Sequence, residues 1–122
     1  MATLNIREQA FEGSFAQLAV EGEIDLDTVA GLRQTLSGLQ ERGVDRLVLD
    51  MAETRYVNST ALAVLVKFAE GFRERGGGVA LARVTPRVKL VFEMLGLLVF
   101  FKFYDTVEAA RTGFPAGARG RP

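Results

Sequence analysis

The chain has 122 residues, 48% of them hydrophobic and 25% charged, and its 15 basic and 15 acidic residues give a formal net charge of zero. A chain of this length is one domain that buries roughly two-thirds of its unfolded surface. The charges cancel and no long run of either sign occurs, whereas nucleic-acid binders gain much of their affinity from a basic surface, so no nucleic-acid partner is expected. Cysteine and histidine are both absent, which excludes disulfides, thiolate or imidazole metal ligands and Ser-His catalysis. We therefore expect no metal, no cofactor and no catalytic activity.

The N-terminal residues predict no targeting segment. Glu8 and Glu12 lie among scattered apolar residues, without the basic segment and apolar core of a secretory signal. The longest apolar stretch, residues 97–101, is far shorter than the about 20 residues that span a membrane. We expect a cytoplasmic protein with no membrane insertion.

The first third of the chain predicts a hairpin followed by a helix. Residues 4–7 alternate between apolar and polar and indicate a strand with one exposed face, and turn residues at 12–14 lead into a second strand over 15–20. Apolar residues then recur at helical spacing and end near Gly43. These residues are Val29, Leu32, Leu36 and Leu39. Asp25, Asp27 or Thr28 is expected to cap this helix.

A buried strand and a second helix form the centre of the chain. Residues 47–49 are apolar and bounded by charge, which indicates a strand covered on both faces. After a short irregular crossing, a helix begins where Asn58, Ser59 and Thr60 can accept hydrogen bonds from its free first-turn amides. Apolar side chains cover more than half of its circumference, so it is either deeply packed or partly exposed to a partner. The glycines at 76–78 are interpreted as a left-handed cap and a turn, because they follow a helix and open a strand.

The last third predicts a strand over residues 79–84, a helix that starts at Thr85-Pro86 and ends at Gly96, and a strand over 99–104. A short final helix follows. The apolar residues 97–99 suggest a homodimer or partner surface. The predicted fold is α/β, with a mixed, mostly parallel sheet of four to five strands flanked by about four helices. It occupies residues 1–112, and residues 113–122 are expected to form a flexible C-terminal tail.

An ordered set of short motifs resembles the STAS domain, whose best-known members are bacterial anti-sigma-factor antagonists. The largest pieces are Gly-Glu-Ile-Asp at 22–25, Leu-Val-Leu-Asp at 47–50 and Val-Asn-Ser-Thr-Ala-Leu at 57–62. Gly-Gly at 76–77, Gly-Leu at 96–97 and Tyr-Asp-Thr at 104–106 complete the set. The resemblance runs from about residue 18 to residue 110.

This resemblance implies a non-enzymatic protein that binds a partner. In the family, the serine at this helix start is phosphorylated by a serine kinase that is itself the anti-sigma factor. The unphosphorylated antagonist binds this kinase and frees the sigma factor, and a serine phosphatase reverses the modification. By resemblance, Ser59 is the phosphorylation site and Thr60 a minor alternative acceptor.

The resemblance also implies a contact surface for the kinase. The expected contacts at the second helix are Asn58, Thr60, Ala61, Val64 and Phe68. Asp25 and Asp27 lie in a loop that is near the serine in the family, and they are expected either to contact the kinase or to cap the first helix.

Two positions depart from the usual family pattern Asp-Ser-(Ser/Thr)-Gly. Asn58 replaces the acidic residue and caps a helix equally well, but it removes a negative charge beside the phosphate and an acceptor that a kinase could require. Ala61 replaces the glycine and stiffens the turn.

The sequence suggests two alternative functions. In the first, the chain is a STAS scaffold subunit of a signalling or lipid-transport assembly, it is never phosphorylated, and Ser59 is only a helix cap. In the second, Asp50 is the phosphoacceptor of a receiver domain. We reject the receiver domain because its metal site needs an acidic pair at the end of the first parallel strand. Asp25 and Asp27 are the only candidates, and they lie in a predicted helix start.

Overall fold

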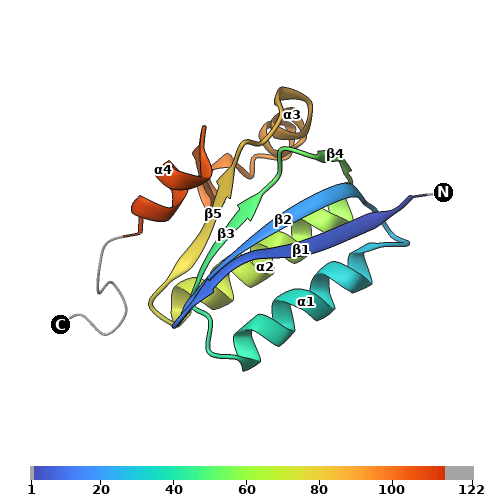
Figure 1. Ribbon diagram of the computed structural model, residues 1–122. Helices are drawn as coiled ribbons and strands as arrows, with labels where there is room; N and C mark the ends of the chain where they lie inside the picture. The colour runs from blue at the N-terminus through green and yellow to red at the C-terminus, as the bar shows by residue number, and fades with distance from the viewer. Residues whose placement is uncertain (1, 115–122) are drawn as a thin grey trace.

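The computed structural model describes residues 2–114, which form one mixed sheet with helices on both faces (Figure 1). The elements are β1 (Leu4–Glu12), β2 (Phe15–Ile24), α1 (Val29–Glu41), β3 (Arg46–Asp50), β4 (Thr54–Val57), α2 (Ser59–Glu74), β5 (Gly78–Ala82), α3 (Pro86–Met94), the 3-10 turn η1 (Leu98–Phe100), β6 (Lys102–Tyr104) and α4 (Val107–Thr112). The sheet order is β1-β2-β3-β5-β6, and β4 pairs with the end of β2. Only the β1–β2 hairpin is antiparallel. The α/β class and the mostly parallel sheet are confirmed.

The sheet has six strands, one more than the largest number expected. The additional strand is β4, which lies between the central strand and the second helix, where the sequence predicts only a short irregular crossing. Its burial pattern places exposed Arg55 and Tyr56 between buried Thr54 and Val57, so it lacks the strict alternation that indicates a strand. The Thr54 hydroxyl donates a hydrogen bond to the Val20 carbonyl at 2.6 Å and holds β4 beside β2.

Two apolar clusters lie on the two faces of the sheet. The larger contains the buried faces of α1, α2 and α3, including Leu32, Leu62 and Phe92. The smaller lies under α4, where Ala110 packs against Phe15 and its neighbours. The helices therefore cover one face almost completely and the other only at the β3, β5 and β6 side.

The last predicted strand is shorter than expected. Residues 98–100 form the turn η1, and β6 begins only at Lys102. Phe101 and Phe103 both pack edge-on against Phe92 of α3, with ring centroids 5.4 Å away. Val99 is 87% exposed, because the turn directs it away from the sheet.

The predicted tail begins at residue 113, and the structure describes its first two residues, Gly113 and Phe114. Phe114 still packs against the smaller cluster, and Gly113 lies so close to the Tyr104 ring that a methyl group would overlap it. Residues 115–122 of the predicted tail lie outside the described residues. Within the described part, none of the helices has the length and apolar character required to cross a membrane.

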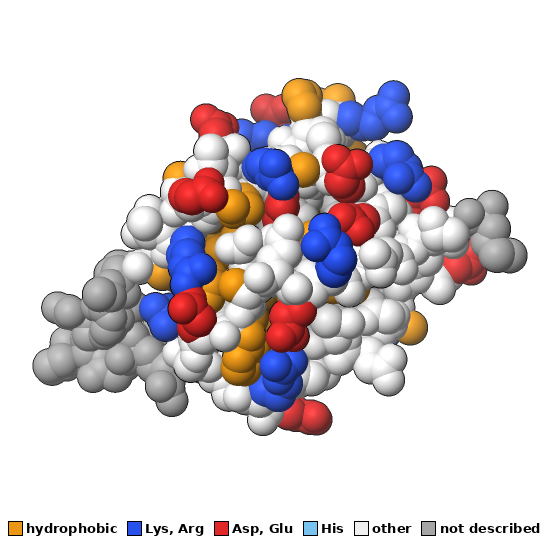
Figure 2. Space-filling model, viewed as in Figure 1, with side chains coloured by type: hydrophobic (Ala, Val, Ile, Leu, Met, Phe, Trp, Pro, Cys, Tyr) orange, Lys and Arg blue, Asp and Glu red, His pale blue; other side chains and the backbone are white. Residues whose placement is uncertain are grey.

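The sheet face that α4 leaves uncovered is polar, and Figure 2 shows acidic and basic side chains interspersed over it. Asp50, at the end of β3, is only 4% exposed and forms two hydrogen bonds with the Arg83 guanidinium, at 2.6 and 3.0 Å. Gln9 and the Ala52 amide also donate to its carboxylate. Arg83 has φ of 57°, a left-handed conformation that disfavours residues with a side chain. Its ion pair with Asp50 helps to hold that conformation.

Asp50 gives the fold a predicted pH dependence. Burial opposes ionisation most strongly, but hydrogen bonds from Arg83, Ala52 and Gln9 together hold the pKa of Asp50 below its ordinary value of 3.8. A lowered pKa contributes stability that is present above that value and is lost as the pH falls through the folded-state pKa. We expect Asp50→Asn to lower the free energy of unfolding by about 1 kcal/mol near pH 7, since Arg83 is half-exposed, and by less near pH 3. Urea denaturation at both pH values measures this difference.

The control is Glu70→Gln, which changes an exposed acid on α2. It is expected to leave stability within about 0.5 kcal/mol at both pH values. An Asp50→Asn effect equal at the two pH values would contradict the assigned role of the ionised carboxylate.

Candidate partner-binding site

Asn58 connects β4 to α2 and caps the helix. Its backbone is extended, and its side-chain Oδ1 accepts a hydrogen bond from the Ala61 amide at 2.8 Å. Its own amide donates to the Ile24 carbonyl of β2 at 3.1 Å, and its carbonyl accepts from the Leu62 amide. Asn58 is thus the N-cap residue, and it ties the start of α2 to the end of β2.

Ser59 is the first residue of α2 and is exposed. The expectation that Asn58, Ser59 and Thr60 share the capping is corrected: only the Asn58 side chain accepts a first-turn amide. Within residues 2–114, the Ser59 hydroxyl has no hydrogen-bond partner. It therefore lies at the positive end of a 16-residue helix without being needed to hold that helix.

Asp25 shapes the turn between β2 and α1. Its Oδ1 accepts hydrogen bonds from the amides of Asp27 at 2.9 Å and Thr28 at 3.2 Å. Thr28 in turn donates its hydroxyl to the Glu23 carbonyl at 2.7 Å. The Asp25 carboxylate thus holds the turn, whereas Asp27 is exposed. The hydrogen bond between Asn58 and Ile24 brings the start of this turn next to the start of α2, in keeping with the STAS resemblance.

The expected contact surface on α2 is corrected for three residues. Ala61 is 0% and Val64 8% exposed, and both belong to the larger apolar cluster. Phe68 is half-buried and lines a groove between α1 and α2. It lies nine residues after Ser59, which is half a turn away on an α-helix. None of the three shares an exposed surface with Ser59.

Other exposed residues belong to the segments that adjoin Ser59, namely the β2–α1 turn, the end of β4 and the first turns of α2. Ala63, one turn further along α2, is exposed on the same side of the helix. Leu26 in the β2–α1 turn is 71% exposed, and Tyr56 on β4 is 50% exposed. We define the Ser59 surface as Leu26, Tyr56, Ser59, Thr60 and Ala63. Ala63 could have been identified from the sequence, because residues four apart on a helix lie on the same side. Tyr56 could not, because its position depends on β4, which the sequence did not predict.

The capping role of Asn58 is testable through stability. Asn58→Ala removes the acceptor for the Ala61 amide and is expected to lower the free energy of unfolding by about 1 kcal/mol. Asn58→Asp keeps an acceptor at the same position and is expected to be at least as stable as the original chain. Urea denaturation of the three chains measures both changes. Equal stability of Asn58→Ala and Asn58→Asp would refute the capping assignment.

The fold and this helix start define the class of protein. The STAS domain family pattern matches residues 8–110, so the chain belongs to the STAS domain family. One relative, BtrV of Bordetella bronchiseptica, is 30% identical over 95 residues, which cover 78% of this chain and 82% of BtrV. Another is the anti-sigma-F factor antagonist RsfB of Mycobacterium tuberculosis, 31% identical over 104 residues, which cover 84% of this chain and 83% of RsfB.

A solved structure confirms the architecture. The anti-sigma factor antagonist SpoIIAA in its unphosphorylated form superposes with a TM-score of 0.74 at 17% identity, covering 86% of this chain and 92% of SpoIIAA. The phosphorylated form of SpoIIAA from Bacillus gives a TM-score of 0.68 at 16% identity, covering 88% of this chain and 97% of SpoIIAA. The STAS resemblance drawn from the sequence motifs is therefore confirmed.

Proposed function

We propose that this chain is a cytoplasmic anti-sigma-factor antagonist that binds a serine-kinase anti-sigma factor through the Ser59 surface. Phosphorylation of Ser59 by that kinase ends the binding, and a serine phosphatase restores it. The observation that carries the proposal is the exposed Ser59 hydroxyl at the first position of α2, beside a cap that Asn58 provides. The names of relatives such as RsfB support the same function.

The Ser59 surface suits contact with a protein. Leu26 and Tyr56 are large apolar residues that the described fold leaves exposed at 71% and 50%. In the proposal these two side chains are the apolar contacts for the partner, a role that contiguous exposed apolar patches commonly have. Ser59 and Thr60 are neutral, so a partner could exclude water from them without burying a charge.

A phosphate on Ser59 would have opposite effects in the free and bound antagonist. In the free chain, its charge of about −1.5 to −2 lies at the start of α2, where the helix dipole and the amides of Ser59 and Thr60 favour an anion. In the complex, the same charge enters a contact from which water is excluded, and this costs several kcal/mol unless a cation pairs with it. Release then requires no refolding of the antagonist.

Asn58 makes the modification compatible with this helix start. It supplies the cap without a carboxylate, so no negative charge adjoins the phosphate. Among proteins of this fold, SpoIIAA exists in unphosphorylated and phosphorylated forms, which supports a fold that tolerates both states.

The test is incubation with the kinase anti-sigma factor of the same genome and ATP, followed by intact-mass measurement. We expect one added phosphate, which is lost in Ser59→Ala and retained in Thr60→Ala. Phosphate on Thr60 alone would move the acceptor by one residue and refute the Ser59 assignment. Intact binding with no added phosphate would favour the unphosphorylated scaffold instead.

A further inference from the structure

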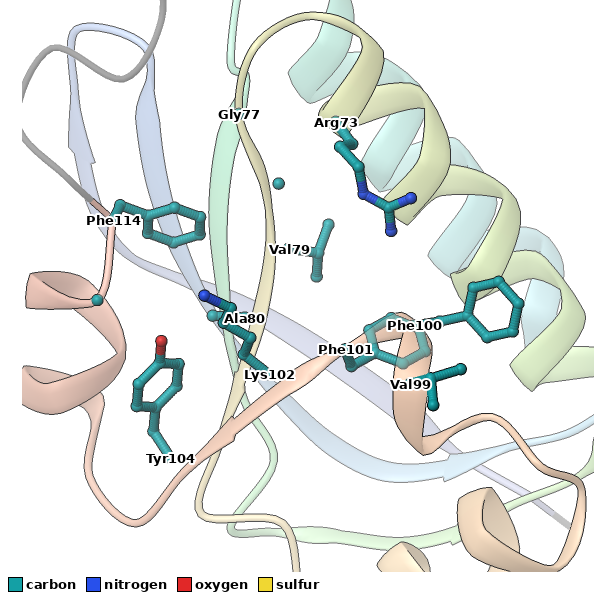
Figure 3. Close-up of a pocket in the computed structure, with 12 residues that line it drawn as sticks. Arg73, Gly77, Val79, Ala80, Val99, Phe100, Phe101, Lys102, Tyr104 and Phe114 are labelled. Atoms are coloured by element: carbon teal, nitrogen blue, oxygen red, sulfur yellow. The ribbon is translucent and has the colours of Figure 1, made fainter.

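A groove of about 500 Å³ opens at the sheet edge near the C-terminal end of α2 (Figure 3). It exists because β6 is short: Lys102 pairs with Ala80, so Gly78 and Val79 of β5 have no β6 residue beside them. The η1 turn carries the preceding residues away from this edge. The space that a longer β6 would fill is therefore open.

The groove is mostly apolar. Its lining includes Val79, Val99, Phe100, Phe101, Tyr104 and Phe114. Small-molecule sites commonly have volumes of about 300–1,000 Å³ and an apolar lining with a few polar groups. The size and lining of this groove fall within that description.

The charged side chains of the groove are cationic. Arg73 projects from α2 and Lys102 from β6, on opposite sides of Val79 in Figure 3. Neither side chain has an ion pair or hydrogen bond within residues 2–114, and no acidic residue in that range lines the groove. The Gly78 amide donates to the Asp45 carbonyl on the β3 side. Because amides alternate along a strand, the Val79 N–H points to the open edge.

We infer that this groove binds a fatty-acid-like molecule, a single alkyl chain with a carboxylate. The carboxylate lies between Arg73 and Lys102, within reach of the Val79 N–H, and the alkyl chain lies against Phe100, Phe101 and the neighbouring apolar residues. The carboxylate complements the charge of the two cationic side chains, and the apolar lining of the groove complements the alkyl chain of the ligand.

Charge disfavours the chain's own C-terminal segment as the occupant. Residues 115–122 contain Arg119 and Arg121 and no acidic residue, so they would add positive charge to a cationic groove.

The groove is also separate from the Ser59 surface. Arg73 lies 14 residues after Ser59, which is about 21 Å along α2. Failure of one proposal leaves the other unaffected.

The test is a titration of the ¹⁵N-labelled full chain with dodecanoate below its micelle concentration, followed by amide chemical shifts. We expect saturable shifts at Gly77, Val79, Phe101, Lys102 and Phe114. Dodecyltrimethylammonium has the same alkyl chain and a cationic head group, and it is expected to bind about tenfold or more weakly. Equal affinity for both amphiphiles, or no saturable shift with dodecanoate, would overturn the inference.

Variants locate the site. Arg73→Gln with Lys102→Gln, and separately Val99→Glu at the exposed rim, are each expected to weaken dodecanoate binding about tenfold or more. Arg33→Gln with Lys67→Gln changes two exposed cations outside the groove and is expected to have no effect. Undiminished binding in the groove variants would overturn the inference. Two further results would also overturn it. The first is that residues 115–122 contact the groove and dodecanoate does not displace them. The second is that the amide chemical shifts of the groove residues change when the protein is diluted, which would indicate that a second copy of the chain occupies the groove.

Discussion

A Ser59→Glu chain is expected to bind the kinase anti-sigma factor about a hundredfold more weakly than the original chain, a loss of about 2.7 kcal/mol. If the proposed kinase contact forms at Ser59, the carboxylate places a charge where that contact would exclude water. The fold itself should not suffer, since a carboxylate in the first turn of a helix stabilises it by about 0.3–1 kcal/mol. Isothermal titration calorimetry with the kinase measures the affinity, and urea denaturation checks the stability.

Ser59→Gln is the matched control, because glutamine has the size of glutamate without its charge. We expect Ser59→Gln to lose much less affinity than Ser59→Glu. Equal losses in the two variants would attribute the effect to bulk and would contradict electrostatic release. Unchanged affinity in both would remove Ser59 from the contact surface altogether.

Gly77→Ala is expected to lower the free energy of unfolding by about 3 kcal/mol or to prevent folding. A methyl group on Gly77 would overlap the Asp45 carbonyl, which belongs to the backbone and cannot move aside as a side chain can. That carbonyl also accepts the Gly78 amide at 2.8 Å, at the point where β5 joins β3. Accommodating the methyl group would therefore require β3 and β5 to separate locally, and this separation lowers the stability. Urea denaturation measures it.

The neighbouring glycine provides the control. A methyl group on Gly78 would lie 3.6 Å from Cε1 of Phe114, an ordinary contact distance. We expect Gly78→Ala to change the free energy of unfolding by less than about 1 kcal/mol. Similar stabilities for the two alanine variants would show that the close approach at Gly77 is not a constraint on the fold.

Elements with strong local signals could be predicted from the sequence. Thr85 accepts the Val88 amide and is followed by Pro86 at the first position of α3, as that pair of residues indicated. Gly76 has φ of 90° and Gly96 φ of 70°, the left-handed conformations expected after α2 and α3. In each of these cases a few neighbouring residues determine the backbone.

Features that depend on distant contacts could not be predicted in this way. Residues 99–104 contain enough β-branched and aromatic residues for a strand, but Phe101 and Phe103 pack on Phe92 and the chain turns before them. On α2, the expected contact surface includes Ala61 and Val64, which follow Ser59 in the first two turns of the helix. The packing of the helix against the sheet, which buries both, depends on residues of other elements.

The capping by Asn58 has a consequence for how this position can evolve. Because position 58 holds α2 in place, residue 59 is free to be serine, threonine or a residue that accepts no phosphate, at little cost to folding. The same scaffold can therefore gain, shift or lose a signalling input through single substitutions, while the rest of the domain remains unchanged.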